Sequence, residues 1–335
     1  MTYVKYEGKK KRKKDIMGAP VICLHGFPDN PDTFVNLAQE IANQGHDVYV
    51  PYLRGYEVGT SKIGSSFDCK NEVSDDIIMF IDSLELDRRI HLVGHDWGAF
   101  IVSVLAKKIP KSVLSVTMMA VPHNFIAGIM SFPRQLILSW YMFFFQIPIL
   151  PERWLLSWGG FEKLVSSWYV KLSVCVQQQQ QQHTNLRSPD WKPPQRFLRS
   201  VKSTLRGPGV ATCALSYYRH FLGVPHLLAA ALLPIVWIFA MSIAIIVSML
   251  KPDMIYNIWI LSGDRSIRVP TLGLTGSNDG CIDTRLFHLG MTKHPELFPK
   301  GVRVVRVKNC GHWLHLERPD VVIKVIKEHI RDSEK

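Results

Sequence analysis

An acidic residue stands where an apolar segment makes a sharp turn, at Asp96 in the stretch 90–99. Gly94 and Gly98 flank it in the order small, any, acid, any, small, which is typical of a strand turning directly into a helix around a strained central residue. An ordinary carboxyl group has a pKa of about 4, so it is ionised at neutral pH and attacks an electrophilic carbon without needing a base. A structural role is the alternative at this point: a buried Asp that caps the following helix.

Two later loops supply a second acid and a histidine. Asp279 follows an apolar run at 269–276, and His312 follows another at 303–307. Nucleophile, acid and histidine occur in the chain order of a hydrolase triad headed by an elbow motif. In such a triad the histidine activates water, while the acid holds the histidine tautomer and stabilises its cation. Asp283 is an alternative to Asp279 that the spacing leaves open.

Alternating strands and helices must position these loops. Apolar runs predict strands at 20–24, 47–51, 90–95, 113–119, 269–276 and 303–307, and helical spacing predicts helices at 33–44, 71–84, 99–108 and 320–331. This alternation implies fold class α/β, with a mostly parallel, doubly wound sheet. Active sites in such sheets lie beyond the carboxyl ends of the strands, where the His25 loop, the elbow and the loop at His123 fall.

The pattern changes after residue 124, where helix-like aromatic segments replace strands. We therefore predict an α/β core at 19–124 and 268–335, interrupted by a helical lid at 125–267. The aromatic residues of the lid, densest at 139–148, would line an apolar pocket over the strand ends.

Two segments of the lid fit this organisation poorly. Gln177 to Gln182 is a homopolymer, which predicts a disordered low-complexity loop. Leu227 to Leu250 holds no charged residue and is long enough to cross a bilayer. A single crossing would place Asp96 and the C-terminal strands on opposite sides of the membrane. We therefore interpret the segment as a buried or surface-lying helix, a re-entrant hairpin around Pro234, or sequence foreign to the native protein.

Composition narrows the class of protein. The net charge is +12, and half of it comes from the run 9–14 within a basic N-terminal segment, 1–18. Because that run lacks the interleaved aromatic and polar residues that base readout needs, we do not expect nucleic-acid binding. The six scattered cysteines predict reduced core thiols in the cytoplasm, and the N-terminus shows no signal peptide. Neither zinc-ligand spacing nor a glycine-rich phosphate loop is present, so we expect no metal or organic cofactor.

Several motifs together resemble the epoxide hydrolase family of α/β-hydrolases. They are the His-Gly-x-Pro loop at 25–28, the Gly-His-Asp-Trp-Gly elbow at 94–98 and the Gly-His-Trp loop at 311–313. The lid is similar too, with Tyr-x-x-x-Phe-Gln-x-Pro at 141–148 and a Tyr-Arg pair at 218–219. The likeness fails over the poly-Gln loop and over 225–267, and the strands that normally precede the first motif look short or replaced by basic residues.

The resemblance implies an α/β-hydrolase fold and a two-step reaction on a small apolar epoxide. Asp96 would attack the less hindered carbon and form an alkyl-enzyme ester, while Tyr141 and Tyr218 donate protons to the opening oxygen. Water activated by His312, with Asp279 as its acid, would then hydrolyse the ester to a vicinal diol.

Other residues of these motifs have assigned or competing roles. The N–H groups of Phe27 and Trp97 are the candidate oxyanion donors. His25 and Pro28 belong to the same binding loop, and Pro28 fixes its backbone. Tyr217 is the alternative to its neighbour Tyr218 as a proton donor.

Two other functions remain open from the sequence. A haloalkane dehalogenase shares the acidic elbow and the histidine base, but halide release needs N–H donors where epoxide opening needs acidic O–H donors. A catalytically impaired protein on the same scaffold, membrane-associated through 227–250 and 9–14, is the alternative from another class.

Overall fold

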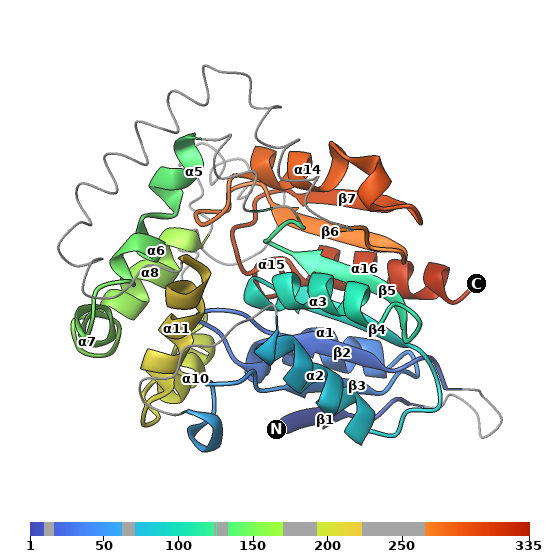
Figure 1. The fold of residues 1–335 in the computed structure, drawn as a ribbon, viewed down its shortest axis with the longest axis horizontal. Coiled ribbons are helices and arrows are strands. Elements are labelled where there is room, and N and C mark those ends of the chain that lie inside the picture. Colours follow the sequence, from blue (N-terminus) through green and yellow to red (C-terminus); the bar gives the residue numbers. More distant parts are fainter. Residues whose placement is uncertain (10–16, 62–70, 124, 126–132, 170–192, 223–264) are drawn as a thin grey trace, which may run out of the picture.

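Seven strands form one sheet in the spatial order β1-β3-β2-β4-β5-β6-β7 (Figure 1). The computed structural model describes residues 1–9, 17–61, 71–123, 125, 133–169, 193–222 and 265–335. The strands are β1 Tyr3–Tyr6, β2 Val21–Leu24, β3 Val48–Pro51, β4 Ile90–His95, β5 Val113–Met119, β6 Thr271–Gly276 and β7 Val302–Val307. All neighbouring pairs from β3 to β7 are parallel.

Helices cover both faces of this sheet, which is why the central strands read as continuous apolar runs. One core packs under α1 (Val35–Ala42) and α16 (Pro319–Ser333). The other packs under α2 (Glu72–Ser83), α3 (Trp97–Lys108) and α14 (Thr284–Thr292), and it continues into the lid. The predicted α/β class, the mostly parallel sheet and the fold are confirmed.

The strand predictions agree with the structure to within two residues, with one omission. The segment 1–18, expected to be only basic, contains β1, which pairs antiparallel with β3 from Tyr3 opposite Pro51 to Tyr6 opposite Val48. The four residues Tyr-Val-Lys-Tyr favour a strand, but the lysines that follow obscure so short a run.

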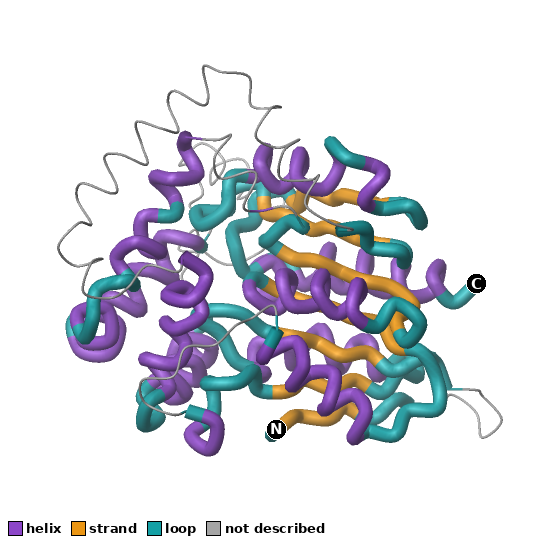
Figure 2. Tube along the Cα trace, in the orientation of Figure 1, coloured by secondary structure: helices purple, strands orange, loops and turns teal. Residues whose placement is uncertain are grey.

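Helices alone make up the described part of the lid, and they lie beyond the carboxyl ends of the strands (Figures 1 and 2). They are α5 Pro133–Leu138, α6 Trp140–Phe144, α7 Leu150–Ser157, α8 Gly160–Trp168, α10 Gln195–Leu205 and α11 Val210–Leu222. The domain boundaries at 124/125 and 267/268 stay predictions.

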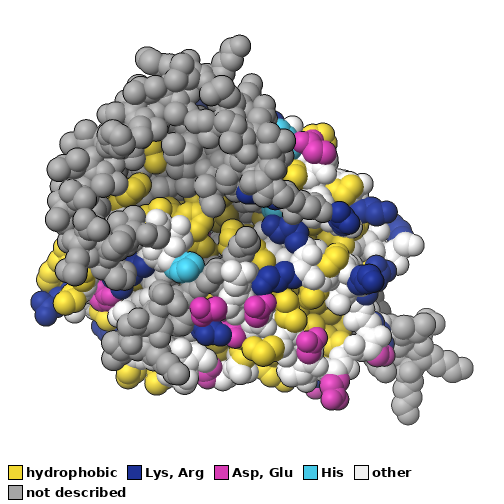
Figure 3. Space-filling view, viewed as in Figure 1, with side chains coloured by type: hydrophobic (Ala, Val, Ile, Leu, Met, Phe, Trp, Pro, Cys, Tyr) yellow, Lys and Arg dark blue, Asp and Glu magenta, His cyan; other side chains and the backbone are white. Residues whose placement is uncertain are grey.

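The poly-Gln loop and the apolar segment 227–250 lie outside the described residues. Among the helices that are described, none combines the length and the apolar character needed to cross a membrane. On the face drawn in Figure 3, acidic side chains lie over the region of α2 with basic ones close by, so that surface carries both signs of charge.

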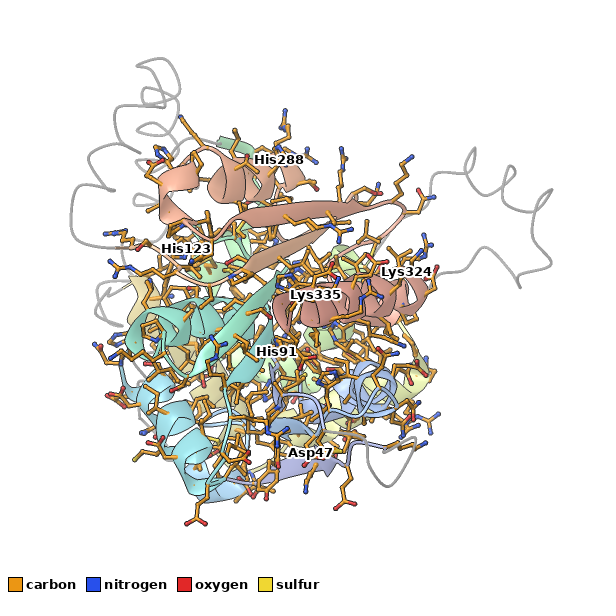
Figure 4. All side chains as sticks on the ribbon, turned by 90° about the vertical axis from the view of Figure 1, so that its right-hand side faces the viewer. Asp47, His91, His123, His288, Lys324 and Lys335 are labelled. Atoms are coloured by element: carbon orange, nitrogen blue, oxygen red, sulfur yellow. The ribbon has the colours of Figure 1, made fainter. Side chains whose placement is uncertain are left out.

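The end of the sheet away from the lid is fastened by the C-terminal helix. Figure 4 looks onto this end, where His91 of β4 lies near the centre of the view, close to Lys335. Glu334 accepts a hydrogen bond from the N–H of Ala19 at 2.9 Å and lies 3.6 Å from Nε2 of His91. The contact with His91, followed by the hydrogen bond from Ala19 and the charge of His46, lowers the pKa of Glu334 to about 2. This contact is therefore structural and remote from the lid.

Candidate active site

Asp96 occupies the turn between β4 and α3 in a strained conformation, with φ 54° and ψ −118°. A non-glycine residue held there costs about 1–3 kcal/mol, and such strain is concentrated at functional sites. The turn requires glycine at Gly98, because a Cβ at that position would overlap the carbonyl oxygen of Leu24 in β2. The elbow thus holds the Asp96 carboxylate at the carboxyl edge of the sheet, facing the lid.

His312 lies between two carboxylates. Its Nδ1 is 3.0 Å from Oδ2 of Asp279, and its Nε2 is 3.5 Å from Oδ2 of Asp96. Asp279 is itself held by the N–H groups of Cys281 and Ile282, which donate to its Oδ1 at 2.7 and 3.0 Å. The structure therefore brings together the three residues expected to form a triad.

Asp283, the alternative acid, faces elsewhere. Its side chain caps α14 by accepting from the N–H of Arg285 at 2.9 Å, and it pairs with the Arg285 guanidinium at 3.2 Å. The distances thus associate Asp279, and not Asp283, with the histidine.

The two carboxylates determine the charge of the histidine. Burial lowers the pKa of His312, but Asp279 and Asp96 outweigh it and raise that pKa to about 10. In the free protein His312 is therefore an imidazolium at neutral pH, and it lies 3.5 Å from the Asp96 carboxyl group.

Phe27 presents a backbone donor to the elbow. Its N–H donates to Oδ1 of Asp96 at 2.8 Å, on the opposite carboxylate oxygen from His312. Trp97 is the first residue of α3, and the first N–H groups of a helix have no intrahelical acceptor. The Phe27 N–H thus lies at an Asp96 oxygen, and Trp97 stays a predicted oxyanion donor.

The rest of the His-Gly-Phe-Pro loop positions Phe27. His25 uses both ring nitrogens on the backbone: Nε2 accepts from the N–H of Leu53 at 3.1 Å, and Nδ1 lies 3.1 Å from the Gly26 carbonyl oxygen. The Phe27–Pro28 peptide bond is cis. His25 therefore holds the loop in place and does not offer a free nitrogen to a substrate.

The two lid tyrosines converge above Asp96. Their ring centroids are 5.6 Å apart, and the Tyr218 ring lies 5.2 Å from that of Phe27 and 5.1 Å from that of Trp97. Burial, followed by nearby acidic groups that include Asp96, raises the pKa of both phenols well above its ordinary value. Both are protonated and suited to donating a hydrogen bond.

The phenols differ in their partners. The Tyr141 hydroxyl lies 3.2 Å from Sγ of Cys281, whereas the buried Tyr218 hydroxyl has no hydrogen-bond partner among the described residues. Tyr217, the competitor of Tyr218, donates instead to the carbonyl of Arg54 at 2.7 Å. Both rings contact Trp97 of the elbow, at 5.7 Å for Tyr217 and 5.1 Å for Tyr218, so the partners of the hydroxyls favour Tyr218 as the proton donor.

Gln146 and Arg219 hold the two tyrosine helices together. The Gln146 amide donates to the carbonyl of Tyr218 at 3.1 Å. Arg219 donates to the carbonyls of Phe145 and Ile147 at 2.9 and 3.1 Å. These contacts give a physical reason for the Gln and Arg of the lid motifs, because they lock α6 against α11.

Comparison with known proteins agrees with this geometry. The family model for the alpha/beta hydrolase fold matches residues 19–319. The chain belongs to the α/β-hydrolase fold family. It is 25% identical to "Epoxide hydrolase 3" of Xenopus tropicalis over 93% of this chain and 71% of that protein, and 25% identical to human "Epoxide hydrolase 4" over 98% and 75%.

Solved structures show the same fold. An epoxide hydrolase from Bacillus megaterium in complex with its diol product superposes with a TM-score of 0.65 at 17% identity, covering 98% of this chain and 96% of that one. An epoxide hydrolase from an endophytic Streptomyces gives 0.64 at 17%, covering 98% and 91%. These structures therefore show that the chain has the α/β-hydrolase fold.

Three positioning residues of this α/β-hydrolase were not found by sequence reasoning. Glu317 accepts from the N–H groups of Gly311 and Trp313 at 2.8 and 3.1 Å and so shapes the histidine loop. Asn30 donates to the hydroxyls of two α10 residues, at 2.8 and 3.0 Å, and so joins the His-Gly-Phe-Pro loop to the lid. Cys281 is the third, through its contact with Tyr141. The partners of Asn30 and Cys281 are distant in sequence, so only the spacing of Glu317 after Gly-His-Trp gave any local signal.

Two groups of side chains have the composition of a cation site. One ligand-type atom from each of Asp96, Cys281 and His312 lies within 4.8 Å of the others, and the same holds for Asp29, His95 and His315. The first group consists of the predicted nucleophile, the predicted base and Cys281, which contacts Tyr141. The second group lies behind it and is not used by the triad.

Proposed function

We propose that this α/β-hydrolase opens a small apolar epoxide to a vicinal diol through an ester on Asp96. The observation that carries the proposal is the arrangement of the Asp96 carboxyl group near two protonated phenols, with the His312 imidazolium 3.5 Å away. Nucleophile, acid and base are thus present for both halves of the reaction.

In the first step an Asp96 oxygen bonds to the less hindered epoxide carbon, and the ring carbon–oxygen bond breaks. The oxygen takes a proton from Tyr218 or Tyr141, and the imidazolium proton of His312 can restore the phenol. The products are a neutral ester on Asp96 and a neutral His312.

In the second step His312 takes a proton from water as the hydroxide adds to the ester carbonyl. The N–H groups of Phe27 and Trp97 would stabilise the resulting oxyanion. The intermediate expels the diol oxygen, which takes a proton from His312 and leaves Asp96 as a carboxylic acid. That acid then gives its proton to His312, which restores both the Asp96 carboxylate and the imidazolium. The sum is epoxide plus water giving diol.

The experiment is a turnover assay with an aryl glycidyl ether, which combines a terminal epoxide with an apolar ring. Wild type is expected to release the diol, and Asp96→Ala is expected to lose that activity. A wild type that folds and gives no diol from a series of apolar epoxides would contradict the proposal.

A haloalkane dehalogenase is the second candidate, and one observation favours it. The indole N–H groups of Trp97 and Trp168 are buried without partners in the described part of the chain, and both rings contact the lid tyrosines. Such donors suit a departing halide. Halide release from a bromoalkane, measured with the same preparation, separates the two functions.

A reducing, cytoplasmic compartment remains part of the proposal, because the thiols of Cys23, Cys281 and Cys310 are buried in the core of the described chain. Cys69 and Cys175 lie outside the described residues, as do most of the run 9–14 and all of 227–250.

A further inference from the structure

Asp29, His95 and His315 form a buried polar cluster behind the elbow, with exposed fractions of 0%, 0% and 1%. None of the three side chains takes part in the proposed reaction. Oδ2 of Asp29, Nδ1 of His95 and both ring nitrogens of His315 lack a hydrogen bond of good geometry among the described residues. A buried polar group left in this way is costly, so the cluster calls for a physical explanation.

The two contacts of His95 fix where its protons are. Nε2 lies 2.9 Å from the backbone carbonyl oxygen of His312. A carbonyl oxygen only accepts, so Nε2 carries the hydrogen. In a neutral ring Nδ1 would then present a lone pair to Oδ2 of Asp29, which is 3.3 Å away. A lone pair facing a carboxylate is repulsive, so a positive charge must lie between these atoms.

The neighbouring groups do not supply that charge. Burial lowers the pKa of His315 to about 3, so this ring is neutral at physiological pH. Burial also lowers the pKa of His25, whose nitrogens are engaged by the backbone. Burial opposes the ionisation of Asp29, but the contact with His95, followed by the other nearby imidazoles, outweighs it and lowers the pKa of Asp29. His95 is the remaining counter-ion for Asp29 in this cluster.

We propose that Asp29 and an imidazolium at His95 form a buried ion pair that positions the catalytic histidine loop through the carbonyl of His312. The His312 N–H donates to the carbonyl of Trp168 at 3.0 Å, so the residue is held on both sides of its backbone. Asp29 and His95 come from the two motifs that build the oxyanion site and the elbow. The ion pair thus couples the His-Gly-Phe-Pro loop and the elbow to the Gly-His-Trp loop. This inference extends the proposed function and rests on it.

The expected effect falls on the second half of the reaction. A loosened His312 would activate water poorly, whereas attack by Asp96 depends less on it. Asp29→Asn removes the negative charge with little change in shape. It is expected to slow ester hydrolysis by about 10- to 100-fold while changing the rate of ester formation by less than about threefold. His315→Gln is the matched control, since it alters the same cluster without a bond to His312.

The protonation of His95 is tested first, by nitrogen NMR of histidine-labelled protein at neutral pH without substrate. Both His95 nitrogens are expected to be protonated in wild type and in His315→Gln, and Nδ1 is expected to lose its proton in Asp29→Asn. A neutral His95 in folded wild type overturns the proposal. So does stoichiometric zinc that co-purifies with wild type and is absent from Asp29→Asn, because a metal ion would then supply the charge.

Rapid-quench kinetics with the aryl glycidyl ether provide the second readout. Selective slowing of ester hydrolysis in Asp29→Asn supports the positioning role, and equal slowing of both steps overturns it. If wild type forms no ester at all, the proposed function fails, while the NMR result still decides whether the ion pair exists.

Discussion

The chemistry of the site depends on one histidine shared by two carboxylates. His312 is an imidazolium in the free protein, because Asp279 and Asp96 together raise its pKa to about 10 against the effect of burial. In the proposed reaction, esterification would neutralise Asp96 and leave only Asp279 to stabilise the cation. The pKa of His312 should therefore fall at the step for which we propose it as the base.

This coupling predicts how hydrolysis of the ester depends on pH. Below the pKa of His312 in the ester, the ring is protonated and hydrolysis should slow about tenfold for each pH unit. Above it, the rate should reach a plateau well before pH 10. Single-turnover decay of the ester between pH 5 and 10 measures this. A rate that keeps rising to pH 10 would show that esterification leaves the pKa of His312 unchanged.

The free hydroxyl of Tyr218 predicts that its loss affects ring opening most. Tyr218→Phe should lower the rate of ester formation by about 10²- to 10⁴-fold, since a general acid contributes in that range. The matched control is Tyr217→Phe, whose hydroxyl bonds the Arg54 carbonyl away from the elbow. It should cost about 1 kcal/mol of stability with ester formation nearly unchanged. The reverse pattern would assign the proton donor to Tyr217.

At the scale of elements, the elbow depends on α3 approaching β2 closely. In Gly98→Ala the added Cβ would meet the backbone oxygen of Leu24, which cannot turn aside as a flexible side chain can. We expect a loss of about 1–3 kcal/mol in unfolding free energy, together with loss of activity. Gly59→Ala is the control, because a Cβ there meets no atom within 4 Å. Denaturant unfolding of both variants gives the comparison, and equal stabilities would contradict a tight elbow.

The elements that carry the site could largely be predicted, because apolar runs end in polar loops at one edge of the sheet. β2, β4 and β6 are followed by His25, Asp96 and Asp279, as the sequence indicates. β1 was missed, since four residues beside a basic run give little periodicity. The hydrogen bonds of Asn30 to α10 and of His95 to His312 were also missed. Asn30 and its partners are at least 170 positions apart, and His95 and His312 are 217 positions apart. Local sequence patterns carry no information about contacts between such distant residues.

At the scale of the whole molecule, buried histidines make the fold sensitive to acid. Burial lowers the pKa of His123 and His315 to about 3 and that of His329 to about 4. In the unfolded chain these three histidines take up protons near pH 6.5, whereas in the folded chain they do so only at a lower pH. Stability should therefore fall as the pH drops from about 6.5 toward 4, by up to about 4 kcal/mol per pH unit for three protons.

Urea unfolding between pH 7 and 4.5 tests this dependence. Replacing His329 by Gln removes one of the three protons, so the slope should decrease by about 1.4 kcal/mol per pH unit. A wild-type protein equally stable across that range would show that these histidines are protonated in the fold.

The covalent ester is the species that most directly tests the proposed reaction. The aryl glycidyl ether is mixed with wild type, His312→Gln and Asp96→Ala, the mixtures are quenched in acid, and the intact mass and peptides are measured. We expect a mass increase equal to one epoxide, located on Asp96, which accumulates in His312→Gln, is transient in wild type and is absent from Asp96→Ala. Diol formation by wild type with no adduct on Asp96 in His312→Gln would contradict nucleophilic attack by this carboxylate.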